Sequence, residues 1–332
     1  MSFGVRRATR REILVGLGGC CVAGASLAKS GTRTLAAADV HVDGYPTVQA
    51  VRWIGSRLEE QTEGRLTIRV YHAGQLGRES ETIDMTRFGA LDVTRVNFAS
   101  LNNPFPLTRI FSLPYVFESV THFRRAADSE VGRAVLRGFE QRQLVGLAIY
   151  DAGSRSFYNT RRAVNEPADL HGLKIRVPPS DIFLELARSL GANPTPLPYG
   201  EVYSALQTHL IEGAENNWRT FHTSRHFEVA RYWSGSHHSY SPEALLISAR
   251  TMESLDAKDR DLLRQLALES VPFMREIWDR MEADSRAQVV ASGVHTNEVD
   301  MTAFRRAAQP LVAEYLSSQD LRDLYDGIRA LG

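Results

Sequence analysis

The stretch that decides the fold runs from residue 173 to residue 218. It begins with LKIRVPPS (173–180) and ends with EGAENNW (212–218). Apolar residues at 173, 175 and 177 alternate with Lys174 and Arg176. This period of two is typical of a strand with one buried face and one polar face. Arg176 is therefore predicted to lie on the polar face, near the carboxyl end of the strand.

The residues after this strand predict a helix. Two prolines end the strand, Ser180 is a candidate N-cap, and apolar residues recur at helical spacing from 182 to 190 before Gly191. Backbone N–H groups at a helix start favour anions. Arg176 is thus a candidate to hold a ligand carboxylate through a planar, bidentate fork. Spacing alone leaves open the more ordinary alternative, a surface arginine paired with an aspartate.

The first residues differ in composition from the rest of the chain. TRREIL (9–14) has the form of a twin-arginine export motif, and a glycine-rich apolar run follows it to residue 23. That run is too short to span a bilayer. LAAA (35–38) would suit signal peptidase, so we predict a signal peptide over residues 1–38, a mature chain starting near Asp39, and a periplasmic location. The alternative is a lipoprotein-type box at LGGC (17–20).

Charge and cysteine content exclude several classes of function. The first 38 residues hold six of the 39 basic and one of the 39 acidic residues, which leaves residues 39–332 with a formal charge of about −5. This balance argues against nucleic acid and anionic membranes as partners. Cys20 and Cys21 are the only cysteines, so the mature chain has neither a disulfide nor a thiolate site.

The pattern along the chain predicts two α/β halves. A strand at 65–70, a helix at 79–88 and a second strand at 92–98 form a βαβ unit, which favours a largely parallel sheet. LVGLAIY (144–150) is typical of a strand covered on both faces. A further helix is predicted over 199–210 and an apolar strand over 244–248, before a long helix over 257–292 that contains Pro272. No repeat or low-complexity linker interrupts the pattern.

Motifs of catalysis and metal binding are absent from the sequence. It contains no Gly-x-Ser-x-Gly and no His-Glu-x-x-His run. His237 and His238 are adjacent, so on a strand they point to opposite faces and make poor joint metal ligands. Asp181, Glu212 and Glu215 have no spacing that supports an acid–base pair. We therefore expect no catalytic residue, no metal site and no cofactor.

Polar side chains gather where the predicted strands end. In a doubly wound sheet the carboxyl ends of the strands converge on one crevice, which is where ligands bind. Each residue alone could be a cap or a solvated group, but the set predicts a binding crevice. Its members are Gln75, Glu79, Asn97, Arg155, Arg176 and Asn216.

Several ordered motifs resemble the solute-binding proteins of tripartite ATP-independent periplasmic (TRAP) transporters. The resemblance covers essentially the whole chain after the leader, and its markers are GQLG (74–77), LPY (113–115), DLHGLKIRV (169–177), GANPTP (191–196), EVYSALQT (201–208) and GAENNW (213–218). It implies two α/β domains with crossing segments, a cleft between them and a long helix spanning both. The implied boundaries are 39–152 plus 242–281 for the first domain and 153–241 plus 282–332 for the second.

The resemblance also implies roles for individual residues. Arg176 matches the arginine that pairs with the ligand carboxylate, Asn216 the asparagine that assists it, and Arg155 a second basic contact. Tyr199 matches an aromatic ring against the ligand. The remaining implied cleft residues are Glu79 and Asn97, expected to bind hydroxyls, together with His41, Gln75 and His238.

The ENNW variant and the setting of Arg155 in SRSFY are similar to the hexuronate-binding branch of this family. We therefore expect a monomeric extracytoplasmic protein that binds glucuronate or galacturonate and delivers it to a membrane permease. Arg219 departs from that branch, which often has proline at this position, and Arg78 has no evident role. The alternatives are a binder of another organic acid (a dicarboxylate, an aldonate or a hydroxy acid) and an exported sugar-acid enzyme.

Overall fold

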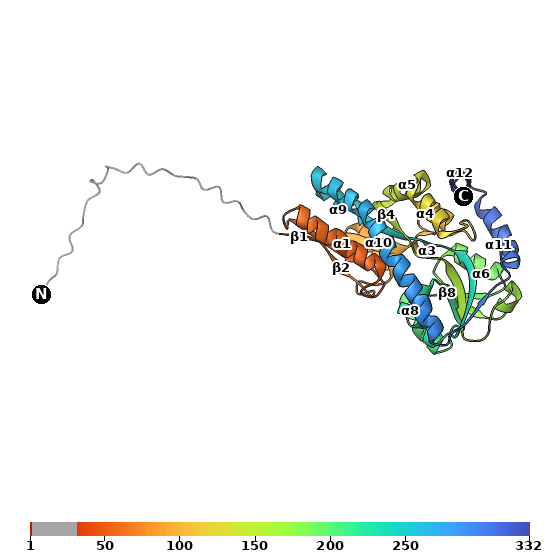
Figure 1. Cartoon of the computed structure of the whole chain (residues 1–332). Helices are drawn as coiled ribbons and strands as arrows, with labels where there is room; N and C mark the ends of the chain where they lie inside the picture. Colours follow the sequence, from red (N-terminus) through yellow and green to blue (C-terminus); the bar gives the residue numbers. More distant parts are fainter. Residues whose placement is uncertain (2–31) are drawn as a thin grey trace. The chain divides into compact units, whose positions relative to one another are not determined.

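The computed structural model describes Met1 and residues 32–332, and its strands form two mixed sheets (Figure 1). The first sheet has the order β2-β1-β3-β10-β4 and the second the order β11-β9-β5-β8-β6-β7. The strands of the first sheet are β1 (Arg33–Ala38), β2 (Leu66–Tyr71), β3 (Val93–Asn97), β4 (Leu144–Tyr150) and β10 (Glu243–Ser248). Those of the second are β5 (Arg155–Asn159), β6 (Lys174–Val177), β7 (Asn193–Pro196), β8 (Gly213–Asn216), β9 (Tyr232–Ser239) and β11 (His295–Glu298).

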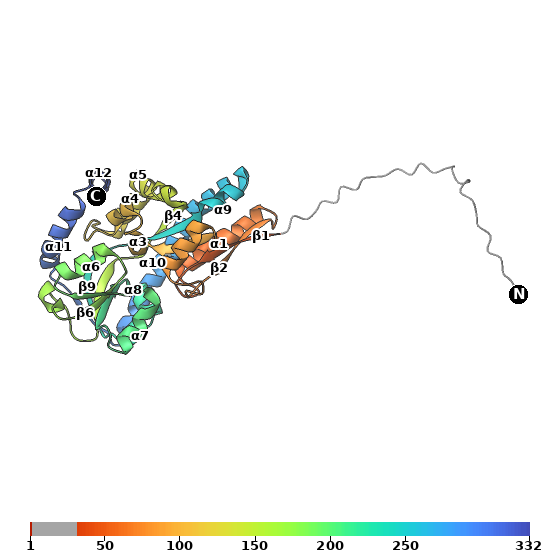
Figure 2. The ribbon, with the colours of Figure 1, turned by 180° about the vertical axis from the view of Figure 1, so that it is seen from behind.

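Helices surround both sheets, as an α/β fold requires (Figures 1 and 2). The α-helices are α1 (Pro46–Gln61), α2 (Glu79–Phe88), α3 (Phe98–Leu101), α4 (Val120–Asp128), α5 (Glu130–Arg137), α6 (Asp181–Ser189), α7 (Val202–Gln207), α8 (Trp218–Thr223), α9 (Ala249–Ser254), α10 (Ala257–Ala291), α11 (Met301–Tyr315) and α12 (Gln319–Arg329). Short 3₁₀ helices are η1 (Pro106–Phe111), η2 (Glu140–Arg142), η3 (Pro167–Leu170), η4 (Tyr199–Glu201) and η5 (His226–Glu228). None of the helices in the described part is long and apolar enough to cross a membrane.

The strand β1 corrects the predicted start of the mature chain. It pairs in parallel with β2 along its whole length and also with β3, and Leu35 and Ala37 are buried in the core beneath it. Cleavage before Asp39 would remove this central strand. The predicted signal peptide therefore cannot extend to residue 38, and the twin-arginine motif itself lies outside the described residues.

Each sheet is mostly parallel and receives one antiparallel strand. β10 runs antiparallel between β3 and β4, and β5 runs antiparallel between β8 and β9. The chain passes from one sheet to the other at residues 151–154 and again at 240–242. Two crossings of this kind match the predicted architecture.

The helix α10 is a third link between the sheets. Its 35 residues correspond to about 50 Å at 1.5 Å per residue, and it contacts α1, β4 and α8 (Figure 1). Arg275 on this helix and Arg124 on α4 both donate to Asp151, which is buried in the first crossing. The crossing is thereby fixed to α10 by charge-assisted hydrogen bonds.

Local differences from the predicted elements have simple physical causes. The helix predicted over 199–210 is divided into η4 and α7, directly after Pro198. Ser180 occupies the N-cap of α6, but its hydroxyl accepts from Asn102 instead of capping the helix. Gly191 ends the predicted helix with a φ of +87°, a conformation that favours glycine. α12 falls in the predicted second domain, but it contacts η1 and α5 of the predicted first domain. The exact domain boundaries stay a prediction.

Candidate functional site

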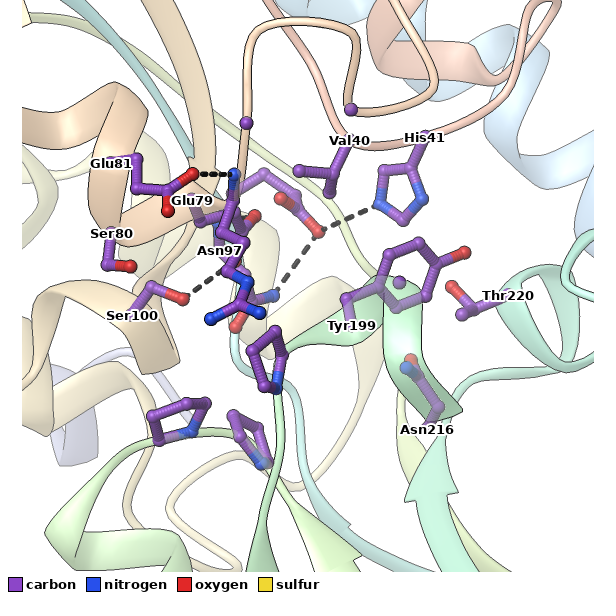
Figure 3. Close-up of a pocket in the computed structure, with 18 of the residues that line it drawn as sticks. Val40, His41, Glu79, Ser80, Glu81, Asn97, Ser100, Tyr199, Asn216 and Thr220 are labelled. Carbon is purple, nitrogen blue, oxygen red and sulfur yellow. Dashed lines mark hydrogen bonds and ion pairs between the residues drawn. The ribbon is translucent and has the colours of Figure 1, made fainter. Parts of the chain in front are cut away.

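The strand ends of both sheets meet at a cavity of about 430 Å³, a volume in the range of small-molecule sites. Parallel strands reach it with their carboxyl ends, and the antiparallel β5 and β10 reach it with their amino ends. Its lining includes seven of the predicted site residues: His41, Glu79, Asn97, Arg155, Arg176, Tyr199 and Asn216. Figure 3 shows several of them around the cavity, with Glu79 and Asn97 on one side and Tyr199 and Asn216 on the other.

Arg176 is a buried cation without an acidic partner. The residue is 4% exposed, and its Nε donates to the carbonyl oxygen of Leu197 at 2.9 Å. Within residues 32–332 no carboxylate lies within ion-pair distance of its guanidinium. Burial lowers the pKa of Arg176, because the charged form is costly in a poorly solvated site. Burial, with help from Arg176, also lowers the pKa of His226 to about 3.

Arg155 differs from Arg176 because a protein carboxylate neutralises it. Its Nε and Nη2 donate to the two oxygens of Glu215 at 2.5 and 2.8 Å, and Nη1 donates to Oδ1 of Asn216 at 3.2 Å. Burial alone would raise the pKa of Glu215, but Arg155 and His238 outweigh it and hold that pKa at about 2. The pair therefore stays ionised, and Arg155 fixes the position of Asn216.

A buried cluster of four charged side chains forms the wall built by the first sheet. Arg95 on β3 bonds to both oxygens of Asp39, to Glu243 and, at 3.3 Å, to Glu79. We call these four residues the acidic cluster, because three carboxylates surround one guanidinium. Burial raises the pKa of Glu79, and Arg95 only partly offsets this. For Glu243, Arg95 and then His41 outweigh burial and lower the pKa to about 2.

Sequence reasoning missed three members of the acidic cluster, Asp39, Arg95 and Glu243. A charged residue within the buried strand VTRVN (93–97) was a usable signal, because buried charges need partners. The partners themselves were not recognisable, since Glu243 lies 148 positions away in the chain. It reaches Arg95 only because β10 inserts beside β3.

Asn97 is saturated by the protein itself. Its Nδ2 donates to the carbonyl of Ser241 at 2.8 Å and to Glu243 at 3.2 Å. Its Oδ1 accepts from the Ala99 N–H and from the Ser241 hydroxyl. Both amide hydrogens are thus in use, so Asn97 positions Glu243 and the second crossing.

Two aromatic rings, those of His41 and Tyr199, line the cavity, and Tyr45 packs behind His41. His41 stacks on Tyr45 with ring centroids 3.7 Å apart and meets the edge of Tyr199 at 5.1 Å. The Nδ1 atom of His41 is buried and has no hydrogen-bond partner in the described part of the chain. Tyr199 bonds to Ser224, and burial raises its pKa to about 12. The Tyr199 ring therefore offers the cavity an apolar face, and His41 meets the edge of that ring.

The two arginines without a role at the sequence level have clear positions. Arg78 precedes α2 and pairs with Glu201 of η4 at 2.6 Å, so it connects the two sides of the cavity mouth. Both side chains are substantially exposed, at 58% and 40%. Arg219 donates to Ser285 of α10 at 3.1 Å and does not line the cavity.

Two of the predicted contact residues do not line this cavity. Gln75 is exposed in the loop after β2 and does not line the cavity. His238 is fully buried behind it, where Nε2 lies 3.2 Å from Glu215 and Nδ1 lies 2.9 Å from the Ser236 hydroxyl. Its neighbour His237 is exposed, which confirms that the two histidines face opposite ways. The described residues contain no group of three or more His, Cys, Asp or Glu that could hold a metal ion.

Comparison with known proteins places this geometry in a family. The model of the bacterial extracellular solute-binding protein family 7 matches residues 37–319. A TRAP periplasmic solute-binding protein from a Bradyrhizobium species, in complex with D-galacturonate, is 42% identical, with a TM-score of 0.88 over 90% of this chain and 100% of that one. One from Roseobacter denitrificans with bound β-D-glucuronate is 37% identical, with a TM-score of 0.87 over 90% and 99%.

The similarity extends to a structure with a different sugar acid. A TRAP solute-binding protein from a Polaromonas species, bound to D-erythronate, is 25% identical, with a TM-score of 0.86 over 90% of this chain and 98% of that one. The family match, the two sheets and the cavity between their strand ends agree with one another. The chain therefore belongs to the TRAP-type bacterial extracellular solute-binding proteins of family 7.

Proposed function

We propose that this protein binds a hexuronate, D-glucuronate or D-galacturonate, in the cavity and delivers it unchanged to a TRAP membrane permease. The observation that carries the proposal is the buried guanidinium of Arg176, which has no carboxylate partner among residues 32–332. A buried charge without a partner is strongly unfavourable. A ligand carboxylate would remove that cost, and its two oxygens match the fork formed by Nη1 and Nη2.

Asn216 supports a carboxylate at the same place. Its Oδ1 accepts from Arg155 and from the N–H of Asn217, which fixes the orientation of the amide. Its Nδ2 donates to no group within residues 32–332 and lies in the cavity lining. A neutral donor beside Arg176 would complete the coordination of a carboxylate. Charge-assisted bonds of about 1.5–3 kcal/mol each make micromolar affinity, about −8 kcal/mol, attainable.

The opposite wall favours a polyhydroxylated ligand. Glu79 and Glu243 present carboxylate oxygens to the cavity, and these accept hydrogen bonds from hydroxyl groups. Tyr199 provides a ring against which the apolar face of a sugar can pack. The relatives from Bradyrhizobium and Roseobacter, with D-galacturonate and β-D-glucuronate bound, support a hexuronate over other sugar acids. The relative with D-erythronate makes an aldonate the second candidate.

Calorimetric titration against a panel of acids tests the proposal. We expect micromolar or tighter binding of D-glucuronate or D-galacturonate and weaker binding of an aldonate, a C4 dicarboxylate and a branched hydroxy acid. If neither hexuronate binds while another acid does, the hexuronate assignment is wrong and the family membership is unaffected. Incubation with the bound sugar, followed by NMR, separates a binder from an exported sugar-acid enzyme. A binder returns the ligand unchanged, whereas new resonances would contradict transport as the sole role.

A further inference from the structure

The acidic cluster has an excess of negative charge. Asp39, Glu79 and Glu243 together face one guanidinium, that of Arg95. The carboxylates outnumber the guanidinium, and the Nε2 atom of His41 lies 3.8 Å from Glu243. The side chains of Arg95, Asp39 and Glu243 are no more than 4% exposed, and that of Glu79 is 12% exposed. Solvent therefore screens this charge poorly.

Only part of the acidic cluster lines the cavity. Asp39 is saturated, since its oxygens accept from Arg95, from the Thr47 hydroxyl at 2.9 Å and from the His41 N–H at 2.8 Å. Glu79 and Glu243 line the cavity and Asp39 does not. These two carboxylates are the groups that a bound molecule would meet.

Glu79 and Glu243 offer free acceptor positions to the cavity. A carboxylate has about four acceptor positions. Glu79 accepts from Arg95, the Asn97 N–H and the Ser100 hydroxyl, and Glu243 accepts from Arg95 and Asn97. Each retains acceptor capacity, while both hydrogens of the Asn97 amide are already used. A hydroxyl group can donate to these carboxylates, whereas a second carboxylate of the ligand would meet two groups of like charge.

We propose that Glu79 and Glu243 act as a charge filter, so that the cavity accepts acids with one carboxylate and an uncharged hydroxylated end and rejects acids with a carboxylate at both ends. The filter rests on the proposed function in one respect: the first carboxylate of the ligand lies at Arg176. Glu243 determines most of the specificity, because it is more deeply buried than Glu79. Like charges brought together in a desolvated site discriminate strongly between ligands.

A matched pair of linear acids isolates this effect. D-galactonate and galactarate differ only at one terminal carbon, which is a hydroxymethyl group in the first and a carboxylate group in the second. Calorimetry on the full mature protein should give a dissociation constant for galactarate at least 100-fold higher than for galactonate, about 2.7 kcal/mol. The variant Glu243→Gln keeps the shape and an acceptor oxygen for Arg95 but removes one charge. We expect it to lower the ratio of the two constants at least tenfold.

Two further variants provide controls. Glu79→Gln should lower the ratio by a smaller factor, and it keeps the filter testable if Glu243→Gln does not fold. Glu253→Gln removes the same charge from an exposed position on α9 and should leave the ratio unchanged. The filter is refuted if the wild-type protein binds galactarate as tightly as galactonate, or if neither cavity variant changes the ratio.

Failure of the filter is distinguishable from failure of the proposed function. Uronate binding together with equal affinity for galactonate and galactarate would overturn the filter alone. Selectivity between galactonate and galactarate without uronate binding would overturn the hexuronate assignment alone. Loss of binding for every acid with one carboxylate would overturn both.

Discussion

Replacement of Arg176 and of Arg155 by methionine should have opposite consequences, although both arginines line the same cavity. Arg176 uses Nε for the Leu197 carbonyl, and its Nη1 and Nη2 groups have no partner within residues 32–332. In our proposal they form two charge-assisted hydrogen bonds to the ligand, each of about 1.5–3 kcal/mol. Arg176→Met loses both, which amounts to about 3–6 kcal/mol and weakens binding at least about 100-fold.

The stability of the ligand-free protein supplies the contrast. Arg176→Met loses one hydrogen bond to Leu197 and also removes an unpaired buried charge, so these terms oppose each other. We expect the free energy of unfolding to change by no more than about 1 kcal/mol. Arg155→Met leaves Glu215 buried without its partner and should lower that free energy by about 3–5 kcal/mol.

Urea unfolding without ligand and calorimetry with D-galacturonate and D-glucuronate measure the two effects. Arg188→Met, at an exposed position on α6, is the control and should change neither quantity. Arg176→Lys keeps the charge but loses the fork, and we expect binding to weaken by about 10- to 150-fold through the loss of one bond. The reasoning is refuted if Arg176→Met binds within threefold of the wild type, or if it is destabilised as much as Arg155→Met.

Three other predictions concern acid stability, cleft closure and processing. The folded pKa of His226, about 3, lies below its unfolded value, so the unfolded state binds more protons between about pH 6.5 and 3 and stability falls as pH falls through that window. Between pH 6 and pH 5 the free energy of unfolding, measured with urea, should therefore fall by about 1 kcal/mol more in the wild type than in His226→Gln. The same pH dependence of this free energy in both proteins would contradict the prediction. The Arg78–Glu201 pair is exposed and contributes up to about 1 kcal/mol, so Glu201→Gln should raise the dissociation constant of the ligand up to about fivefold. Salt screens an exposed pair, so the effect should be smaller at high salt. An equal effect at all salt concentrations would argue against an ion pair. Mass spectrometry of the exported protein should place its first residue before β1, and a mature chain that starts at Asp39 and remains folded would contradict the role of that strand.

The acidic cluster shows most clearly why part of the site could not be predicted. Arg176 was identified from the alternation of its strand, which is visible in the sequence, and Asn216 from the motif that resembles the family. Glu243 also stands at a strand end, but its importance depends on β10 lying between β3 and β4. That placement follows from a crossing between the sheets, and no local sequence periodicity indicates it.

The strand β1 was missed for a different reason. LAAA (35–38) contains small residues that suit a signal peptidase as well as a strand. The structure resolves this ambiguity, because the backbone of these residues pairs with β2 and β3 and their side chains enter the core. Conversely, α2 and β4 have the predicted bounds. For β4, the nearly continuous apolar run of residues 144–150 indicated the strand directly.

The sequence by itself determined the α/β class, most helices and strands, the family and the importance of Arg176. These follow from short-range patterns and ordered motifs, which local physical chemistry controls. The tertiary structure alone decided that Arg176 is buried without a carboxylate from the described part of the chain, while Arg155 is paired with Glu215. It also moved Gln75 and His238 out of the cavity and assembled the acidic cluster from residues far apart in the chain. Charge pairing and burial depend on which strands become neighbours, and the sheet order fixes those neighbours.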